Sequence, residues 1–114
     1  MKSFFIFFLS FCFTVILAEP VNLLIECSAP QNVAATSINA GNISFDWDDC
    51  SGGCTEYKVK YHREEDSYSS SEFTTSSSAF SFSNLPDGTY DFYFSTVCGG
   101  DASSLIIIEE IVID

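Results

Sequence analysis

Residues 84–94 read Asn84-Leu85-Pro86-Asp87-Gly88-Thr89-Tyr90-Asp91-Phe92-Tyr93-Phe94, a tight turn that leads directly into a strand. The proline fixes φ for the turn, and Asp87-Gly88 supplies residues that tolerate positive φ. Large rings then recur with the period of two that a half-buried strand requires, at Tyr90, Phe92 and Phe94. This combination indicates a β-sandwich.

The same period of two extends to both sides of this segment. Residues 42–48 alternate Ile43, Phe45 and Trp47 with polar side chains, and residues 56–62 alternate Tyr57, Val59 and Tyr61 in the same way. We expect further strands at 33–37, around Phe73, and at 79–82, 89–97 and 105–113, and no segment has a helical period. About seven short antiparallel strands between turns predict an all-β, immunoglobulin-like β-sandwich.

The first 18 residues have the layout of a signal peptide. Lys2 precedes an apolar run from Phe4 to Leu17, and a small residue is then followed by Glu19-Pro20. The rival interpretation is a membrane anchor, but the run is shorter than the roughly 20 apolar residues that a spanning helix needs. We therefore expect a secreted or cell-surface protein with no stable membrane insertion after cleavage.

The mature chain has the length of one domain. Roughly 96 residues bury somewhat over half of their surface on folding, which is too little for two cores. Residues 19–28 form an apolar N-terminal lead, and residues 29–114 form the domain.

The mature chain is strongly acidic. Its basic residues are Lys58, Lys60 and Arg63, against sixteen Asp and Glu residues. This balance makes attraction to nucleic acid or to anionic lipid unfavourable.

Four cysteines remain after cleavage, which are Cys27, Cys50, Cys54 and Cys98. An even number in a small exported chain predicts disulfides, and the sequence alone allows three pairings. Zinc is the alternative, but a Cys-x3-Cys pair with two distant single cysteines fits metal-ligand patterns poorly.

Residues 29–114 resemble a fibronectin type III domain. The resemblance rests on Ala29-Pro30 and Val33 at the start, Trp47 on the second strand, the Tyr57-x-Val59-x-Tyr61 pattern on the third, and Leu85 before Tyr90. It implies that Tyr90 is a tyrosine corner, whose hydroxyl bonds to nearby backbone. The chain departs from the family pattern in two ways: Leu85 precedes Tyr90 by five positions rather than six, and the domain carries cysteines.

The resemblance also implies a disulfide pairing, because the cysteines are similar to those of a variant found in exported bacterial proteins. In this fold the start of the chain lies beside the loops after the second and sixth strands. Cys27 would then pair with Cys98, and Cys50 with Cys54. A crossed arrangement, Cys27 with Cys50 and Cys54 with Cys98, would gather the same loops and stays open.

Catalysis has little support in the sequence, and no cofactor is indicated. The single histidine, His62, ends a strand and has no free cysteine or Ser/His/Asp set to join it. Calcium is a candidate ligand, since Asp48, Asp49 and Asp101, with Glu26, are expected at one end of the sandwich and carboxylate oxygens bind this ion. The simpler interpretation of these acids is a solvated rim.

Two surfaces are candidates for partner contact. Lys58, Lys60 and His62 are expected on the outward face of the third strand, beside Tyr93 of its neighbour. This patch is either ordinary cross-strand pairing or a contact surface for an acidic or carbohydrate partner.

The last strand, 105–113, is the second surface, because it is apolar on both faces. We expect Ile106 and Ile108 to be covered by the lead at 21–25, by a second copy or by a partner strand. The sequence therefore predicts a binding or adhesion module that acts through protein contacts. The alternative is a structural or matrix subunit that self-associates through this edge.

Overall fold

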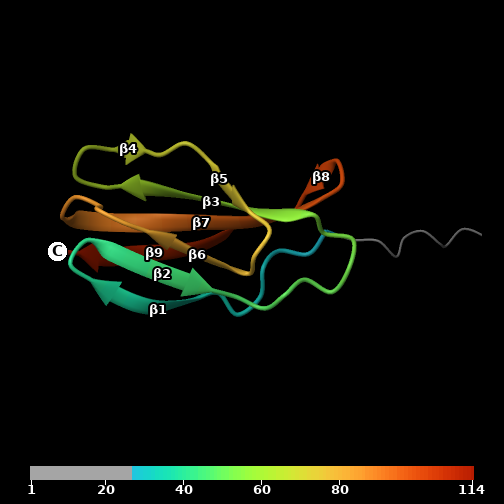
Figure 1. Cartoon of the computed structure of the whole chain (residues 1–114). Helices are drawn as coiled ribbons and strands as arrows, with labels where there is room; N and C mark the ends of the chain where they lie inside the picture. The colour runs from blue at the N-terminus through green and yellow to red at the C-terminus, as the bar shows by residue number, and fades with distance from the viewer. Residues whose placement is uncertain (1–26) are drawn as a thin grey trace, which may run out of the picture.

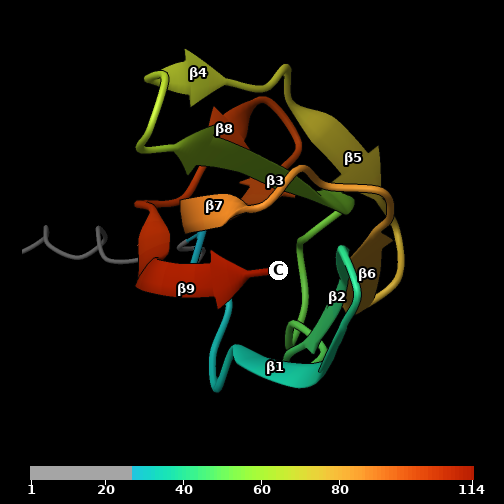
Figure 2. The same ribbon diagram turned by 90° about the vertical axis from the view of Figure 1, so that its left-hand side faces the viewer.

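The computed structural model describes residues 27–114 as two antiparallel sheets packed face to face (Figures 1 and 2). The predicted signal peptide and most of the apolar lead lie outside the described residues. One sheet has the order β1 (Ala34–Asn39), β2 (Asn42–Asp46) and β6 (Ala79–Phe82). The larger sheet runs β4 (Tyr68–Ser69), β3 (Glu56–Arg63), β7 (Gly88–Cys98) and β8 (Asp101–Ala102), with β5 (Phe73–Thr75) on β3 and β9 (Ile106–Ile113) on β7. The all-β, immunoglobulin-like sandwich is thus confirmed.

The core lies between the sheets and is built by the predicted alternation. Its aromatic centre joins the two layers, with the ring of Phe45 on β2 at 4.8 Å from that of Phe92 and 5.0 Å from that of Phe94 on β7. The buried apolar side chains come from both sheets and, at residues 47 and 85, from the segments that connect the strands: Ile43, Phe45, Trp47, Tyr57, Val59, Phe82, Leu85, Tyr90, Phe92, Phe94 and Ile113. Because every second residue of a strand faces the same way, the period-two pattern predicted most of this list.

Each of the seven expected strands has a counterpart, and β4 and β8 are additional. Both additions have two residues, too few to show a period, and they form because tertiary pairing places Ser69 opposite His62 and Ala102 opposite Val97. The second strand ends at Asp46 rather than Asp48.

The turn before β7 differs from the prediction in one detail. Positive φ occurs at Asn84, where it is 59°, and not at Asp87 or Gly88. The hydroxyl of Tyr90 donates a hydrogen bond to the carbonyl of Pro86 at 2.5 Å, which is the expected tyrosine corner.

None of residues 27–114 forms a helix of the length and apolarity that a membrane crossing requires.

Candidate functional site

One end of the sandwich is tied by both disulfides. Cys27 pairs with Cys98 at a Cα separation of 5.6 Å, and Cys50 pairs with Cys54 at 6.4 Å. Both separations fit ordinary disulfide geometry. The first bridge fastens the start of the domain to the end of β7, and the second closes the loop between β2 and β3. The structure thus contains the pairing of Cys27 with Cys98 and of Cys50 with Cys54, and not the crossed alternative.

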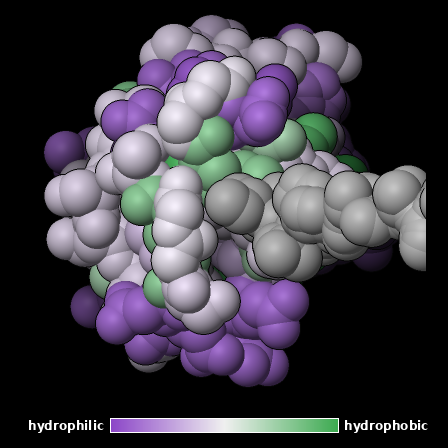
Figure 3. All heavy atoms as spheres, turned by 90° about the vertical axis from the view of Figure 1, so that its right-hand side faces the viewer, coloured by the Kyte–Doolittle hydropathy of each residue, from purple (hydrophilic) through white to green (hydrophobic). Residues whose placement is uncertain are grey.

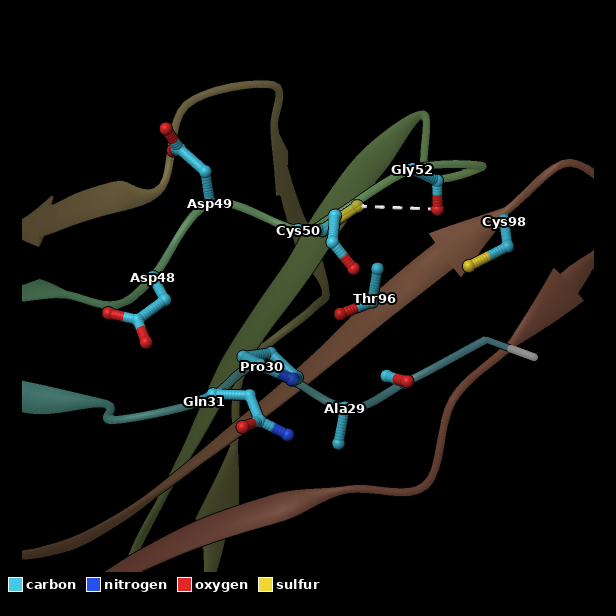
Figure 4. A pocket seen from close by; sticks show the side chains of 11 residues that line it. Ala29, Pro30, Gln31, Asp48, Asp49, Cys50, Gly52, Thr96 and Cys98 are labelled. Carbon is cyan, nitrogen blue, oxygen red and sulfur yellow. Dashed lines mark hydrogen bonds between the residues drawn. The ribbon is translucent and has the colours of Figure 1, made fainter. Parts of the chain in front are cut away.

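A pocket of about 320 Å³ lies between these tied segments (Figure 4). Its lining residues are Ser28, Ala29, Pro30, Gln31, Asp48, Asp49, Cys50, Ser51, Gly52, Thr96 and Cys98. Figure 3 views this end of the molecule and shows apolar atoms between two hydrophilic margins. The pocket is formed because both disulfides hold separate loops beside one strand.

Thr96 contributes a buried hydroxyl to this pocket. The residue is 1% exposed, and its Oγ1 has no hydrogen-bond partner within residues 27–114. Its backbone is satisfied, since its N–H donates to Ser103 Oγ at 2.9 Å. Sequence analysis missed this residue, because a threonine at an inward position of a strand gives no signal of an unpaired hydroxyl.

The acids proposed for calcium do not converge. Asp48 accepts a hydrogen bond from Asn32 Nδ2 at 2.6 Å, and the side chains of Asp48 and Asp49 point away from each other (Figure 4). Asp101 lies on β8. Across the described part of the chain, no three His, Cys, Asp or Glu side chains come together in a group that could hold a metal ion. Glu26 lies outside the described residues.

The larger sheet has a second feature, which we call the outer face and define as Lys58, Lys60, His62, Tyr93, Leu105 and Ile107. The strand register places Lys60 opposite Tyr93, and Tyr93 opposite Ile107. Lys60 Nζ lies 5.7 Å from the centroid of the Tyr93 ring, a cation–π contact. The face therefore combines positive charge with aromatic and aliphatic surface.

The other two basic groups of this face make short polar contacts. Lys58 Nζ lies 3.4 Å from Glu72 Oε1, and His62 Nδ1 lies 3.0 Å from Ser69 Oγ. Lys58 therefore has a carboxylate partner, whereas Lys60 has none among the described residues.

The structure separates the apolar side chains of β9 and the residue before it into an inward set and an exposed set. Ile106 and Ile108 are partly buried and pack against the core, because they pair with the inward residues Phe94 and Phe92. The exposed apolar side chains are instead Leu105 at 50%, Ile107 at 46% and Val112 at 60%. The sequence alone did not separate the two sets, since both faces of this segment are apolar.

These features define a disulfide-bonded, immunoglobulin-like β-sandwich whose distinctive side chains lie on one sheet face and in one end pocket. The fibronectin type III domain model matches residues 28–109, so the chain belongs to the fibronectin type III family. No curated protein matches this chain.

Several solved structures share the fold. The fibronectin type III domain of the human collagen alpha-1(XX) chain has a TM-score of 0.67 at 15% identity, covering 78% of this chain and 88% of that one. A computer-redesigned β-sandwich protein has a TM-score of 0.66 at 18% identity, covering 77% and 91%. The FN1–FN3 domains of chicken CNTN1 have a TM-score of 0.65 at 16% identity, covering 77% of this chain and 32% of that one. At such identities the likeness concerns the fold alone.

Proposed function

We propose that this protein is a secreted or cell-surface binding module that contacts a partner protein through its outer face and catalyses no reaction. Membership of the fibronectin type III family supports a protein-binding role, because this fold is generally non-catalytic and commonly mediates protein interactions. Export is supported by the leader-like sequence of residues 1–18 and by the two disulfides, which persist in oxidising compartments.

One observation carries the choice of surface. Leu105 and Ile107 are about half exposed beside Tyr93 and the lysines, in a chain with a net charge of −12. Exposed apolar side chains next to an aromatic ring are typical of the centre of a protein interface. Because Lys60 is positively charged, the partner should offer carboxylates opposite it, and an apolar area opposite the exposed aliphatic side chains.

The experiment measures saturable binding of the labelled, oxidised chain to intact cells of the source organism. Replacing Tyr93 by Ala should weaken binding about tenfold, since an interface tyrosine commonly contributes a kcal/mol or more. Lys60→Ala should weaken it most at low salt, because an exposed charge acts mainly through screened electrostatics.

Ser76→Asp is the matched control, because it changes the net charge by the same amount as Lys60→Ala and lies in the exposed loop between β5 and β6. Its binding should stay within about twofold of the unmodified chain. Equal losses in Lys60→Ala and Ser76→Asp, or undiminished binding by Tyr93→Ala, would refute the outer face as the contact surface.

A second candidate function is self-association into a structural or matrix subunit. Within the described residues, β9 hydrogen-bonds to β7 alone, so its other side is an edge with exposed apolar side chains. Such an edge can pair with the same strand of a second copy. This function requires a molecular mass that rises with concentration, and a charge on the edge of β9 should abolish that rise.

A further inference from the structure

A second hollow lies at the end of the sandwich opposite the disulfides. Its volume is about 310 Å³, and its lining residues are Tyr61, Arg63, Asp66, Tyr68, Pro86 and Tyr90. It forms where the turn from β3 to β4 approaches the turn before β7, the end that faces the viewer in Figure 2. We call it the tyrosine hollow. It shares no lining residue with the outer face or with the disulfide-tied pocket.

Aromatic rings form its wall. The Tyr61 ring lies 6.1 Å from that of Tyr68, 5.4 Å from that of Tyr90 and 5.4 Å from that of Phe82 on the opposite sheet. Tyr61 and Tyr90 are therefore fixed by the core, whereas Tyr68 is 53% exposed. The result is a rigid aromatic wall with one ring open to solvent.

A charged pair flanks these rings and is held by the backbone. Arg63 Nε donates to the carbonyl of Asp87 at 3.0 Å, and Nη2 contacts the same oxygen. Arg63 Nη1 lies 3.3 Å from Asp66 Oδ2, and Asp66 Oδ1 accepts from the Tyr68 N–H at 3.3 Å. A guanidinium has five N–H donors and a carboxylate has about four acceptor positions, so both groups keep hydrogen-bonding capacity for a ligand.

The tyrosine hydroxyls add to this capacity. Neither the Tyr61 nor the Tyr68 hydroxyl makes a hydrogen bond to any other residue of the described chain, 27–114. Burial and the neighbouring Tyr68 raise the pKa of Tyr61 above its ordinary value, so its hydroxyl stays protonated and can donate. The hollow thus presents donors and acceptors around an apolar aromatic centre.

We propose that the tyrosine hollow binds a sugar ring of a neutral oligosaccharide. The C–H face of a pyranose is apolar and slightly positive, which suits the negative face of the Tyr68 ring. The hydroxyl groups of the sugar can both accept a hydrogen bond from Arg63 and donate one to Asp66. Asp66 lines the hollow, and Glu64, Glu65 and Asp87 are sequence neighbours of its lining residues Arg63, Asp66 and Pro86, so the local negative charge disfavours an anionic ligand.

The test is a titration of the oxidised, isotopically labelled chain, followed by nuclear magnetic resonance. The probes are the neutral sugars maltohexaose, cellohexaose, xylohexaose and hexa-N-acetylchitohexaose, each added to about 10 mM, a concentration that detects millimolar affinity. At least one probe should produce saturable shifts of the Tyr68 backbone N–H and the Arg63 Nε–H signals. The signals of the outer face should stay unchanged.

The variants separate ring stacking from a general effect on folding. Tyr68→Ala should weaken binding about tenfold or more, and Tyr68→Phe, which keeps the ring, should bind within about threefold of the unmodified chain. Tyr68 is half exposed on a two-residue strand, so its truncation leaves the core intact. Tyr93→Ala is the matched control, because it removes an outer-face ring and should leave sugar binding unchanged.

Absence of shifts with all four probes would overturn the proposal. So would sugar binding that Tyr68→Ala leaves intact. The protein-binding proposal for the outer face is tested with Tyr93→Ala and cell binding, so the two proposals can fail separately.

Discussion

Tyr90 links the turn before β7 to the core with a single side chain. Its ring is fully buried, and its hydroxyl reaches back to the Pro86 carbonyl four residues earlier. The ring therefore contributes apolar burial, while the hydroxyl fixes the path of the turn.

Replacing Tyr90 by Phe tests the hydroxyl alone. The ring stays buried, and the free energy of unfolding should fall by about 1 kcal/mol, the usual net value of one hydrogen bond. Urea unfolding measures the change as a lower midpoint at an unchanged slope. The control is Tyr93→Phe, at a half-buried tyrosine of the same strand. An equal loss in the two variants would mean that the Tyr90 hydroxyl does not stabilise the turn.

Gly88 lies against two long side chains, and its φ angle is not positive. A Cβ at this position would lie 2.6 Å from Arg63 Nε and 2.8 Å from Glu65 Oε1, so these flexible side chains would have to shift to admit it. These side chains cross the start of β7, where the Thr89 N–H donates to the Glu65 carboxylate at 3.0 Å and holds the pKa of Glu65 below its ordinary value. The sequence indicated a turn before β7 correctly, but it placed the positive φ at Asp87-Gly88 rather than at Asn84. It also could not show which side chains would cover Gly88.

Among the elements, β9 is an edge strand with exposed apolar side chains, since within residues 27–114 it pairs with β7 alone. The regular part of β9 is short, because its pairing with β7 shifts register between Tyr90 and Phe92. At this point Glu110 has a φ of 59°, and the Glu110 N–H donates to Asp91 Oδ1 at 3.0 Å. A bulge of this kind interrupts the row of hydrogen-bonding groups along an edge. The stretch open to pairing is therefore Ile106–Glu109.

Ile107→Lys is the variant that tests pairing through this edge. For the self-association function, the mass of the oxidised chain measured by light scattering should rise with concentration, and Ile107→Lys should remain a monomer. A charge in the centre of a strand edge opposes pairing, and Ile107 lies outside the core, so folding should be preserved.

The control for this variant is Thr36→Lys, which adds the same charge to the exposed strand β1 of the other sheet. Thr36→Lys should associate like the unmodified chain. A monomer at every concentration for the unmodified chain would rule out self-association through β9 and leave the outer face as a surface for a foreign partner.

The strands could be predicted where several residues keep a period of two, as in β3 and β7. That pattern also placed Lys60 beside Tyr93, because adjacent strands of a known fold have a known register. The tyrosine hollow could not be predicted in this way. Tyr68 lies in a serine-rich segment with no period, and it meets Tyr61 only because a tertiary hairpin pairs Arg63 with Tyr68.

At the scale of the whole molecule, charge and cross-links have opposite effects. A net charge of −12 favours solubility but adds repulsion within the compact state. The disulfides restrict the unfolded chain, and they do so unequally, because Cys27 and Cys98 are 71 residues apart while Cys50 and Cys54 are 4 apart. The long bridge should therefore contribute most of the cross-link stabilisation.

Replacing the cysteines in pairs measures this difference. Cys27→Ser with Cys98→Ser should lower the free energy of unfolding by about 4 kcal/mol, and Cys50→Ser with Cys54→Ser by about 2 kcal/mol, from the loop lengths that each bridge closes. Guanidinium unfolding gives both values, and mass mapping of the unreduced peptides identifies the bridges directly. In the crossed arrangement each double replacement would disturb both bridges and leave two unpaired thiols, so the two variants would lose similar stability. A larger loss for the 27/98 pair, with no free thiol in either variant, therefore distinguishes the uncrossed arrangement by energetics as well as by mass.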